Sequence, residues 1–198
     1  MTLIINHRVN NLKKLEITPK YFGVEVDLRT LNKKIILNHE PFLNGLNFEI
    51  FIKKFNHQFL ILNIKEEGIE KKVINILNKF KIRNYFLLDS TIPMSLKLTK
   101  KINKCLRISD LEDINIKSKK ISHFNWVWID YINSNYSIDK IKINILKKKK
   151  IRNCFVSPEL VNKADDPKKL KIFLQKNKII PDAICTKNPE YWKKVFNI

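Results

Sequence analysis

The chain has few cysteines, few glycines and few acidic residues for its 198 residues. Its three cysteines, Cys105, Cys154 and Cys185, are far apart and none belongs to a C-x-x-C pair, so they indicate neither a disulfide framework nor a zinc site. No apolar run reaches transmembrane length, and residues 1–7 lack the basic head, apolar stretch and cleavage site of a signal peptide. We therefore expect a cytoplasmic protein.

The shortage of acidic residues leaves a strongly basic chain. Lys and Arg number 39 against 19 Asp and Glu, which gives a net charge of +20. A basic surface attracts phosphodiesters, nucleic acid or acidic lipid headgroups. The alternative is codon bias, because Lys, Asn and Ile are all abundant and glycine is limited to 3 residues. We favour codon bias, and the hydrophobic content of 44% excludes a disordered chain.

Short apolar runs recur along the chain and alternate with segments of helical spacing. Runs that are apolar on both faces are typical of parallel strands buried between helices. Eight such βα units in 198 residues predict one compact (βα)8 barrel domain, with a doubly wound sheet as the alternative. The eight strands are expected to begin near Leu3, Val24, Leu60, Phe86, Leu106, Val127, Phe155 and Ala183.

Helices are expected in the segments between these strands. The stripe of apolar residues over 69–80 is one example, and Pro93, Asp166-Pro167 and Asn188-Pro189 mark helix starts. Ser109 or Asp110 can cap a brief helix that contains Leu111. Residues 11–21 are expected to form a short helix or an irregular segment. The other helices are expected over 48–55, 93–103, 138–149, 166–177 and 188–198.

Two carboxylates, Glu25 and Asp27, interrupt the apolar run of residues 22–28 at a spacing of two. Side chains two residues apart on a strand point to the same face, so both acids share it. Two like charges on a buried face repel each other and are costly to desolvate, and a divalent cation would relieve both problems. The alternative is an edge strand whose polar face meets water.

The next segment predicts a β-hairpin. Residues 29–34 are too few for a helix, so the apolar run 35–38 is expected to fold back antiparallel. With a turn near Asn32-Lys33, this arm places His39 across from Val26-Asp27, beside the carboxylate pair.

Polar side chains collect at the ends of the expected strands, where barrel enzymes carry their active sites. Strand ends are often polar because loops begin there, which accounts for Ser109 and Thr186 but poorly for the histidines and the acidic pair. Metal-binding carboxylates, cationic side chains and two imidazoles together suit phosphoryl transfer. The polar residues at the ends of the expected strands are, in chain order, His7-Arg8, Glu25/Asp27, Asn63/Lys65, Asp89, Ser109, Asp130, Glu159 and Thr186.

These motifs resemble the glycerophosphodiester phosphodiesterase family, whose members are (βα)8 barrels of the phospholipase C-like phosphodiesterase superfamily. The family pattern is H-R, E-x-D, H-D and later E-x-K, and here the corresponding residues are His7-Arg8, Glu25-Val26-Asp27, His39-Glu40 and Asn63-Ile64-Lys65. The run 181–189 also looks like the closing strand of the family. The resemblance therefore spans nearly the whole chain.

The resemblance implies a role for each matching residue. His7 and His39 would be the acid/base pair, and Glu25 and Asp27 would bind Mg²⁺ or Ca²⁺. Arg8 would contact the phosphate of the substrate, as would Lys65.

The chain departs from the family pattern at three points. Asn63 stands where the family has a metal-binding Glu, so Asp130 and Glu159, and after them Asp89, are candidates to replace it. His39 is followed by Glu40 rather than Asp. The residues between His39 and Phe59 are too few for the insertion domain that is typical of the family.

We accordingly predict a metal-dependent phosphodiester hydrolase of lipid metabolism, acting on a small glycerol- or sugar-linked phosphodiester. The alternative is an altered or inactive barrel that binds an anionic sugar phosphate or lipid headgroup. Nucleic-acid binding is disfavoured, because aromatic residues such as Phe51, Phe59 and Phe86 lie within core-like runs instead of alternating with lysines.

Overall fold

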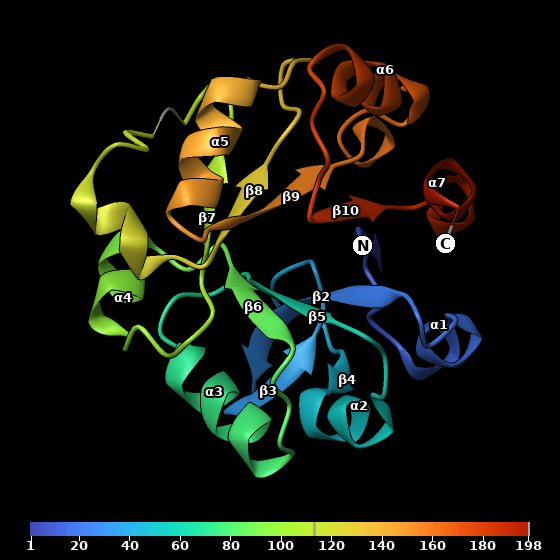
Figure 1. Ribbon diagram of the computed structural model, residues 1–198. Coiled ribbons are helices and arrows are strands. Elements are labelled where there is room, and N and C mark those ends of the chain that lie inside the picture. Colours follow the sequence, from blue (N-terminus) through green and yellow to red (C-terminus); the bar gives the residue numbers. More distant parts are fainter. Residues whose placement is uncertain (113, 198) are drawn as a thin grey trace. The chain divides into compact units, whose positions relative to one another are not determined.

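The computed structural model describes residues 1–112 and 114–197. The chain forms two compact units, Asn6–Ile102 and a second made of Met1–Ile5 with Asn103–Ile198. Each contains mainly parallel strands and helices, as the alternating pattern of the sequence predicts (Figure 1). Among the helices of the described residues, none has the length and hydropathy that a membrane span requires.

The unit Asn6–Ile102 contains strands in the order β4-β3-β2-β5-β6. The strands β2, β5 and β6 are parallel, and β3 and β4 continue the sheet in antiparallel pairs. The bounds are β2 Gly23–Leu31, β3 Lys34–Leu37, β4 Leu46–Asn47, β5 Leu60–Ile64 and β6 Tyr85–Leu88; the helices are α1 Leu12–Ile17, α2 Phe48–Lys54, α3 Glu70–Lys79 and α4 Ile92–Lys97.

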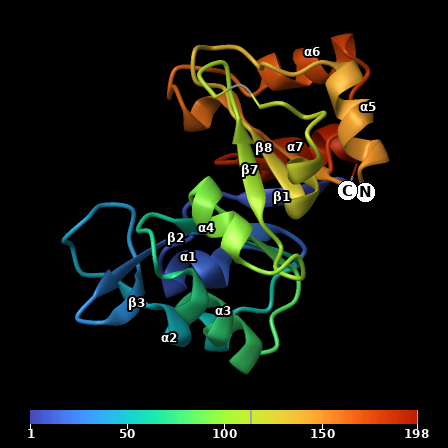
Figure 2. The ribbon, with the colours of Figure 1, turned by 90° about the vertical axis from the view of Figure 1, so that its left-hand side faces the viewer.

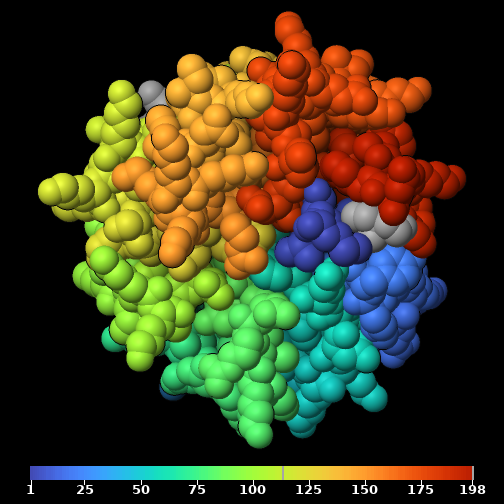
Figure 3. Space-filling model, in the orientation of Figure 1, coloured from blue at the N-terminus to red at the C-terminus, as the bar shows by residue number. Residues whose placement is uncertain are grey.

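The core of this unit lies between one face of the sheet and the helices α2 and α3. Alternate residues of β2 and β5 belong to it together with apolar side chains of both helices, among them Phe51 and Val73. Lys79 of α3 donates a hydrogen bond to Glu49 of α2 (2.7 Å), and the segments that carry the two helices lie side by side in the space-filling view (Figure 3). Residues of β2 at odd positions therefore face away from these helices.

The second unit contains the strand order β1-β10-β9-β8-β7. The pairs from β7 to β10 are parallel, and Leu3 N donates to Asp182 O where β1 lies beside β10. The bounds are β1 Leu3–Asn6, β7 Cys105–Ile108, β8 Trp126–Ile129, β9 Arg152–Val156 and β10 Ala183–Thr186; the helices are η1 Lys119–His123, α5 Lys140–Lys148, η2 Pro158–Leu160, α6 Lys168–Lys176 and α7 Pro189–Phe196.

All eight expected strands are present, and most expected helices form with shorter bounds. The brief helix expected around Leu111 is wrong. The side chain of Ser109 does accept hydrogen bonds from Leu111 N (3.2 Å) and Glu112 N (3.1 Å), but residues 109–112 and 114–116 form no helix. A capping side chain supplies only one or two hydrogen bonds. Because no stripe of apolar residues follows this cap to pack against the core, no helix forms after it.

The predicted hairpin is confirmed. The strands β2 and β3 pair antiparallel from Leu28↔Leu37 to Leu31↔Lys34, and Figure 2 shows them side by side. Asn32 and Lys33 form the turn, with positive φ at both (49° and 63°), as type I′ hairpin turns require. Asn38 N donates to Asp27 O (3.1 Å), which brings the segment of His39 alongside the acidic part of β2.

Gly45 allows the chain to return from this arm to β4. A Cβ at this position would lie 2.3 Å from the carbonyl oxygen of Leu37, a backbone atom that cannot rotate away. We expect Gly45→Ala to lower the free energy of unfolding by about 1–3 kcal/mol, measured by urea denaturation. Leu43→Ala in the same loop is the control, because that side chain is 56% exposed and its loss should leave the unfolding midpoint nearly unchanged. If Gly45→Ala unfolds at the same urea concentration as wild type, residue 45 does not lie so close to the carbonyl oxygen of Leu37.

Candidate functional site

The acidic pair lies on the face of β2 opposite its core. Val24, Val26 and Leu28 pack into the core with α2 and α3, so Glu25 and Asp27 point to the other face, as their spacing predicts. Both are almost fully buried, at 1% and 0% relative exposure. Buried carboxylates require compensation from hydrogen bonds or cations.

Glu25 is surrounded by groups from three segments. Its Oε2 accepts a hydrogen bond from Arg8 N (2.8 Å) and lies 3.7 Å from His7 Nε2. Its Oε1 accepts from Asn63 Nδ2 (3.1 Å). Burial, and then the charge of Asp27, raise the pKa of Glu25 to about 7 in spite of these hydrogen bonds. This buried carboxyl therefore loses its proton less readily than an exposed one.

Asp27 is held by an asparagine that the sequence did not indicate. Asn10 Nδ2 donates to Asp27 Oδ2 (2.8 Å), and Asp27 N donates back to Asn10 Oδ1 (3.0 Å). Two cations lie slightly farther away, with Arg8 Nε 3.8 Å from Oδ2 and Lys65 Nζ 3.8 Å from Oδ1. Lys65 is also 3.9 Å from Asp89 Oδ2. The predicted phosphate ligands thus lie at the predicted metal ligands.

The backbone at the site has unusual conformations. Arg8 and Asp89 follow the ends of β1 and β6 with φ of 51° and 61°, in the left-handed region that non-glycine residues rarely adopt. Lys14 of α1 donates from Nζ to the carbonyl oxygens of His7 (2.5 Å) and Arg8 (2.9 Å). Such conformations persist where surrounding contacts fix them, and they are frequent at functional sites.

His39 follows β3, at the end of the hairpin arm. Its Nδ1 lies 2.6 Å from Glu40 Oε1, and this hydrogen bond lowers the pKa of the Glu40 carboxyl. The imidazole of His39 contacts the exposed Glu40, while that of His7 lies near the buried Glu25. The structure thus groups His7, Arg8, Glu25, Asp27, Asn63, Lys65 and Asp89, with His39 on the adjoining segment.

Two buried oxygens at the site have no hydrogen-bond partner within residues 1–112 and 114–197, Oδ1 of Asp27 and Oδ1 of Asn63. Oxygens of carboxylate and amide groups are the donors that Mg²⁺ and Ca²⁺ prefer. Among the described residues, no group of three or more His, Cys, Asp and Glu is arranged to hold a metal ion. A cation here would accordingly rely on two carboxylates and the amide of Asn63.

Asp130 and Glu159, expected as replacements for the missing carboxylate, lie in the other unit. Asp130 accepts hydrogen bonds from Arg107, from Trp128 Nε1 (3.3 Å) and from Tyr131 N (2.8 Å). Glu159 accepts hydrogen bonds from Ser157 Oγ (2.5 Å), Thr186 Oγ1 (2.5 Å) and Lys187 N (3.1 Å). Both carboxylates are engaged within their own unit, and their role as ligands stays a prediction.

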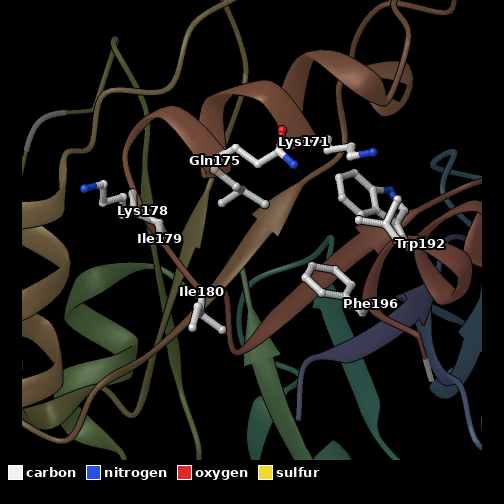
Figure 4. A pocket seen from close by; sticks show the side chains of 9 residues that line it. Lys171, Gln175, Lys178, Ile179, Ile180, Trp192 and Phe196 are labelled. Atoms are coloured by element: carbon white, nitrogen blue, oxygen red, sulfur yellow. The ribbon is translucent and has the colours of Figure 1, made fainter.

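An apolar groove lies elsewhere, between α6 and α7 of the second unit (Figure 4). It has a volume of about 340 Å³ and is lined by Trp192 and Phe196 from one side and by Leu174 and Ile179 from the other. Among the described residues that line it, there is no carboxylate and no imidazole. The groove therefore offers neither a general acid/base nor an anionic metal ligand.

No protein-family model and no curated protein matches the sequence. Solved structures do match it. A glycerophosphodiester phosphodiesterase from Agrobacterium tumefaciens aligns over 100% of both chains with 12% identity and a TM-score of 0.72. One from Thermotoga maritima aligns over 98% of both chains with 15% identity and a TM-score of 0.70. A phosphodiesterase from Oleispira antarctica, in complex with the product sn-glycerol-3-phosphate, aligns over 99% of this chain and 97% of its own, with 13% identity and a TM-score of 0.64.

These alignments extend over practically the whole chain, so they concern its fold and not a local motif. The fold is the α/β (βα)8 barrel, as the sequence predicted, with the β2–β3 hairpin as an added arm. The resemblance recognised from the motifs is thereby confirmed at the level of fold.

Proposed function

We propose that this chain, which shares its fold with glycerophosphodiester phosphodiesterases, is a metal-dependent hydrolase of small phosphodiesters, glycerol- or sugar-linked. The observation that carries the proposal is the group around β2. An imidazole and two cationic side chains from the ends of β1 and β5 lie within 4 Å of two buried carboxylates of β2. The product in the Oleispira antarctica structure, sn-glycerol-3-phosphate, supports a glycerol-linked substrate.

His7 and His39 are the proposed acid/base pair. One imidazole accepts the proton of the attacking hydroxyl, from water or from the substrate's own glycerol, and the other protonates the leaving alkoxide. Glu40 next to Nδ1 of His39 fixes the ring and leaves Nε2 for proton transfer. Glu25 Oε2 lies 3.7 Å from His7 Nε2 and keeps that imidazole beside the carboxylate pair.

Arg8 and Lys65 are the proposed phosphate ligands. Their cationic groups face Asp27 from two directions, and their side chains are 45% and 21% exposed, so both can reach a ligand from water. A guanidinium and an ammonium together can bind the non-bridging oxygens of a phosphodiester and hold its phosphorus in line with the attacking group.

Glu25, Asp27 and Asn63 are the proposed ligands of the divalent ion, Mg²⁺ or Ca²⁺. The buried Oδ1 atoms of Asp27 and Asn63 accept no hydrogen bond from the described residues, which supports this assignment because a cation would satisfy both. When bound, the ion would neutralise charge on the phosphodiester. Asn63 contributes no charge, so affinity for the ion is expected to be lower than with three carboxylates.

Asn63→Glu tests the metal site. We expect this variant to bind Mg²⁺ or Ca²⁺ about 10-fold more tightly or better, measured by calorimetry, because it adds one negative charge to the ligand set. Asn78→Glu on the exposed side of α3 makes the same charge change away from the site and is the matched control. Equal affinities in wild type, Asn63→Glu and Asn78→Glu would contradict Asn63 as a ligand.

The enzyme assay uses a generic aryl phosphodiester and a glycerophosphodiester, each with added divalent ion and with a chelator. Hydrolysis that requires the ion supports the proposal, and hydrolysis unchanged by the chelator contradicts the metal dependence. Asn63 also favours the second candidate function, a barrel that binds a sugar phosphate or lipid headgroup without cleaving it. In that case calorimetry shows binding of sn-glycerol-3-phosphate, and neither substrate is hydrolysed.

The same proposal covers the organisation of the chain. We treat residues 1–198 as one barrel domain without an insertion, because only residues 38–45 lie between β3 and β4. The three cysteines are all buried, and a cytoplasmic location stays a prediction.

A further inference from the structure

Arg29 continues the row of charged residues on the same face of β2. Glu25, Asp27 and Arg29 are spaced by two, so their side chains share the face opposite the core. The two acids are buried, whereas Arg29 is half-buried at the rim of the site. No motif in the sequence singles it out.

The guanidinium of Arg29 joins the two segments on either side of β2. Its Nε donates a hydrogen bond to the carbonyl oxygen of His39 (3.0 Å), and its Nη1 donates to the carbonyl oxygen of Lys65 (2.9 Å). His39 lies beyond β3 and Lys65 directly beyond β5, the two strands that pair with β2. One planar side chain thus connects the chain segments of the proposed acid/base and a proposed phosphate ligand.

The two hydrogen bonds of Arg29 lie where the backbone pairing of β2 with β3 and with β5 ends. The last backbone bonds are Asn38 N to Asp27 O (3.1 Å) on one side of β2 and Lys65 N to Leu28 O (3.0 Å) on the other. Beyond them the strand pairing stops, so the positions of His39 and of the residues after Lys65 depend on side-chain contacts. The fork of an arginine can bridge two carbonyls at fixed geometry, which the single ammonium of a lysine cannot do equally well.

We propose that Arg29 is a positioning residue, which holds the segments of His39 and Lys65 in a fixed relation so that both act on one phosphodiester. This inference rests on the proposed function. A displacement of about 1 Å in a catalytic group can lower a rate by about 10²-fold, so two hydrogen bonds to the main chain are sufficient to matter.

A purely structural role is less well supported, because a different residue fastens the hairpin. Glu66 accepts hydrogen bonds from Thr30 N (2.8 Å) and Thr30 Oγ1 (2.5 Å), which ties β2 to the segment after β5 independently of Arg29. The arm should therefore remain folded when Arg29 is replaced, while the position of His39 and Lys65 becomes less defined.

The test compares Arg29→Met and Arg29→Lys with wild type in the phosphodiester assay. We expect Arg29→Met to lower kcat/KM by about 10–100-fold. Displacement of His39 should lower kcat, and displacement of Lys65 should raise KM. Arg29→Lys should recover part of the loss, because an ammonium can keep one of the two contacts. Arg83→Met, at an exposed arginine of the same unit, is the matched control and should leave kcat/KM unchanged.

A double-mutant cycle distinguishes positioning from general destabilisation. If Arg29 acts through His39, the effect of Arg29→Met on kcat should largely disappear in the His39→Ala background. Full additivity of the two effects on kcat would overturn the inference, as would wild-type kinetics of Arg29→Met. If the wild-type protein hydrolyses neither substrate, the proposed function is refuted. If the wild type is active and Arg29→Met is equally active, only the role of Arg29 is refuted.

Discussion

His7→Ala is expected to lower kcat/KM for phosphodiester hydrolysis by about 10²–10⁴-fold, the range that a general acid or base contributes. The imidazole lies 3.7 Å from the buried Glu25 and next to Arg8, at the proposed position of the phosphate. Alanine removes the proton-transfer group but leaves the hydrogen bond from Arg8 N to Glu25, so the fold of the site should persist. The loss should appear mainly in kcat.

His39→Ala is the partner experiment, and a loss of similar size is expected. His123→Ala, a histidine in η1 outside the proposed site, is the control and should retain the wild-type rate. Steady-state kinetics and thermal unfolding are measured for all three variants. If His7→Ala and His39→Ala both hydrolyse the substrate at the wild-type rate while folded, the acid/base assignment is wrong.

Asp27→Asn is expected to have a second large effect, a loss of about 10²–10³-fold in activity, because it removes charge at the centre of the site. Asp27 contacts Asn10 through Oδ2, while its Oδ1 has no hydrogen-bond partner among the described residues. Asparagine has the same shape, so the variant should fold. Without added divalent ion its stability should stay close to that of wild type, because it removes both the repulsion by Glu25 and the attraction by Arg8 and Lys65.

The measurement is the rise in Tm on adding Mg²⁺ or Ca²⁺. A ligand at 100 times its Kd stabilises the folded state by about 2.7 kcal/mol, so wild type should show a clear shift that Asp27→Asn lacks. Asp110→Asn, at an exposed carboxylate, is the control and should respond as wild type does. An equal shift in Asp27→Asn would show that the ion binds elsewhere.

The strands could be predicted because buried parallel strands are continuous apolar runs, and each run from Leu3 to Ala183 marks one. Short elements that depend on partners could not. The two residues of β4 are defined by pairing with Ile36 and Leu37, a contact that leaves no periodic pattern in the sequence. The helix η1 was not predicted, and the predicted helix around Leu111 does not form. Both errors arise because local helix propensity in a long connection is weak.

The candidate site shows a similar division. The spacing of Glu25 and Asp27 placed both on one face, and the hairpin turn placed His39 near them, since strand geometry dictates both results. Asn10 and Arg29 were missed. Each bonds to a residue at least 10 positions away, and a polar residue in a loop or at a strand end carries no periodicity that would reveal such a partner.

The two-residue turn at Asn32-Lys33 limits how this chain can vary in length during evolution. Surface turns usually tolerate insertions at small entropic cost. Here one extra residue would shift the pairing of β3 with β2, reverse the faces of its side chains and move His39 away from Asp27. The loop 40–45, which follows His39, is free of that constraint. Changes of length in this part of the molecule should therefore be found after His39 and not in the turn before it.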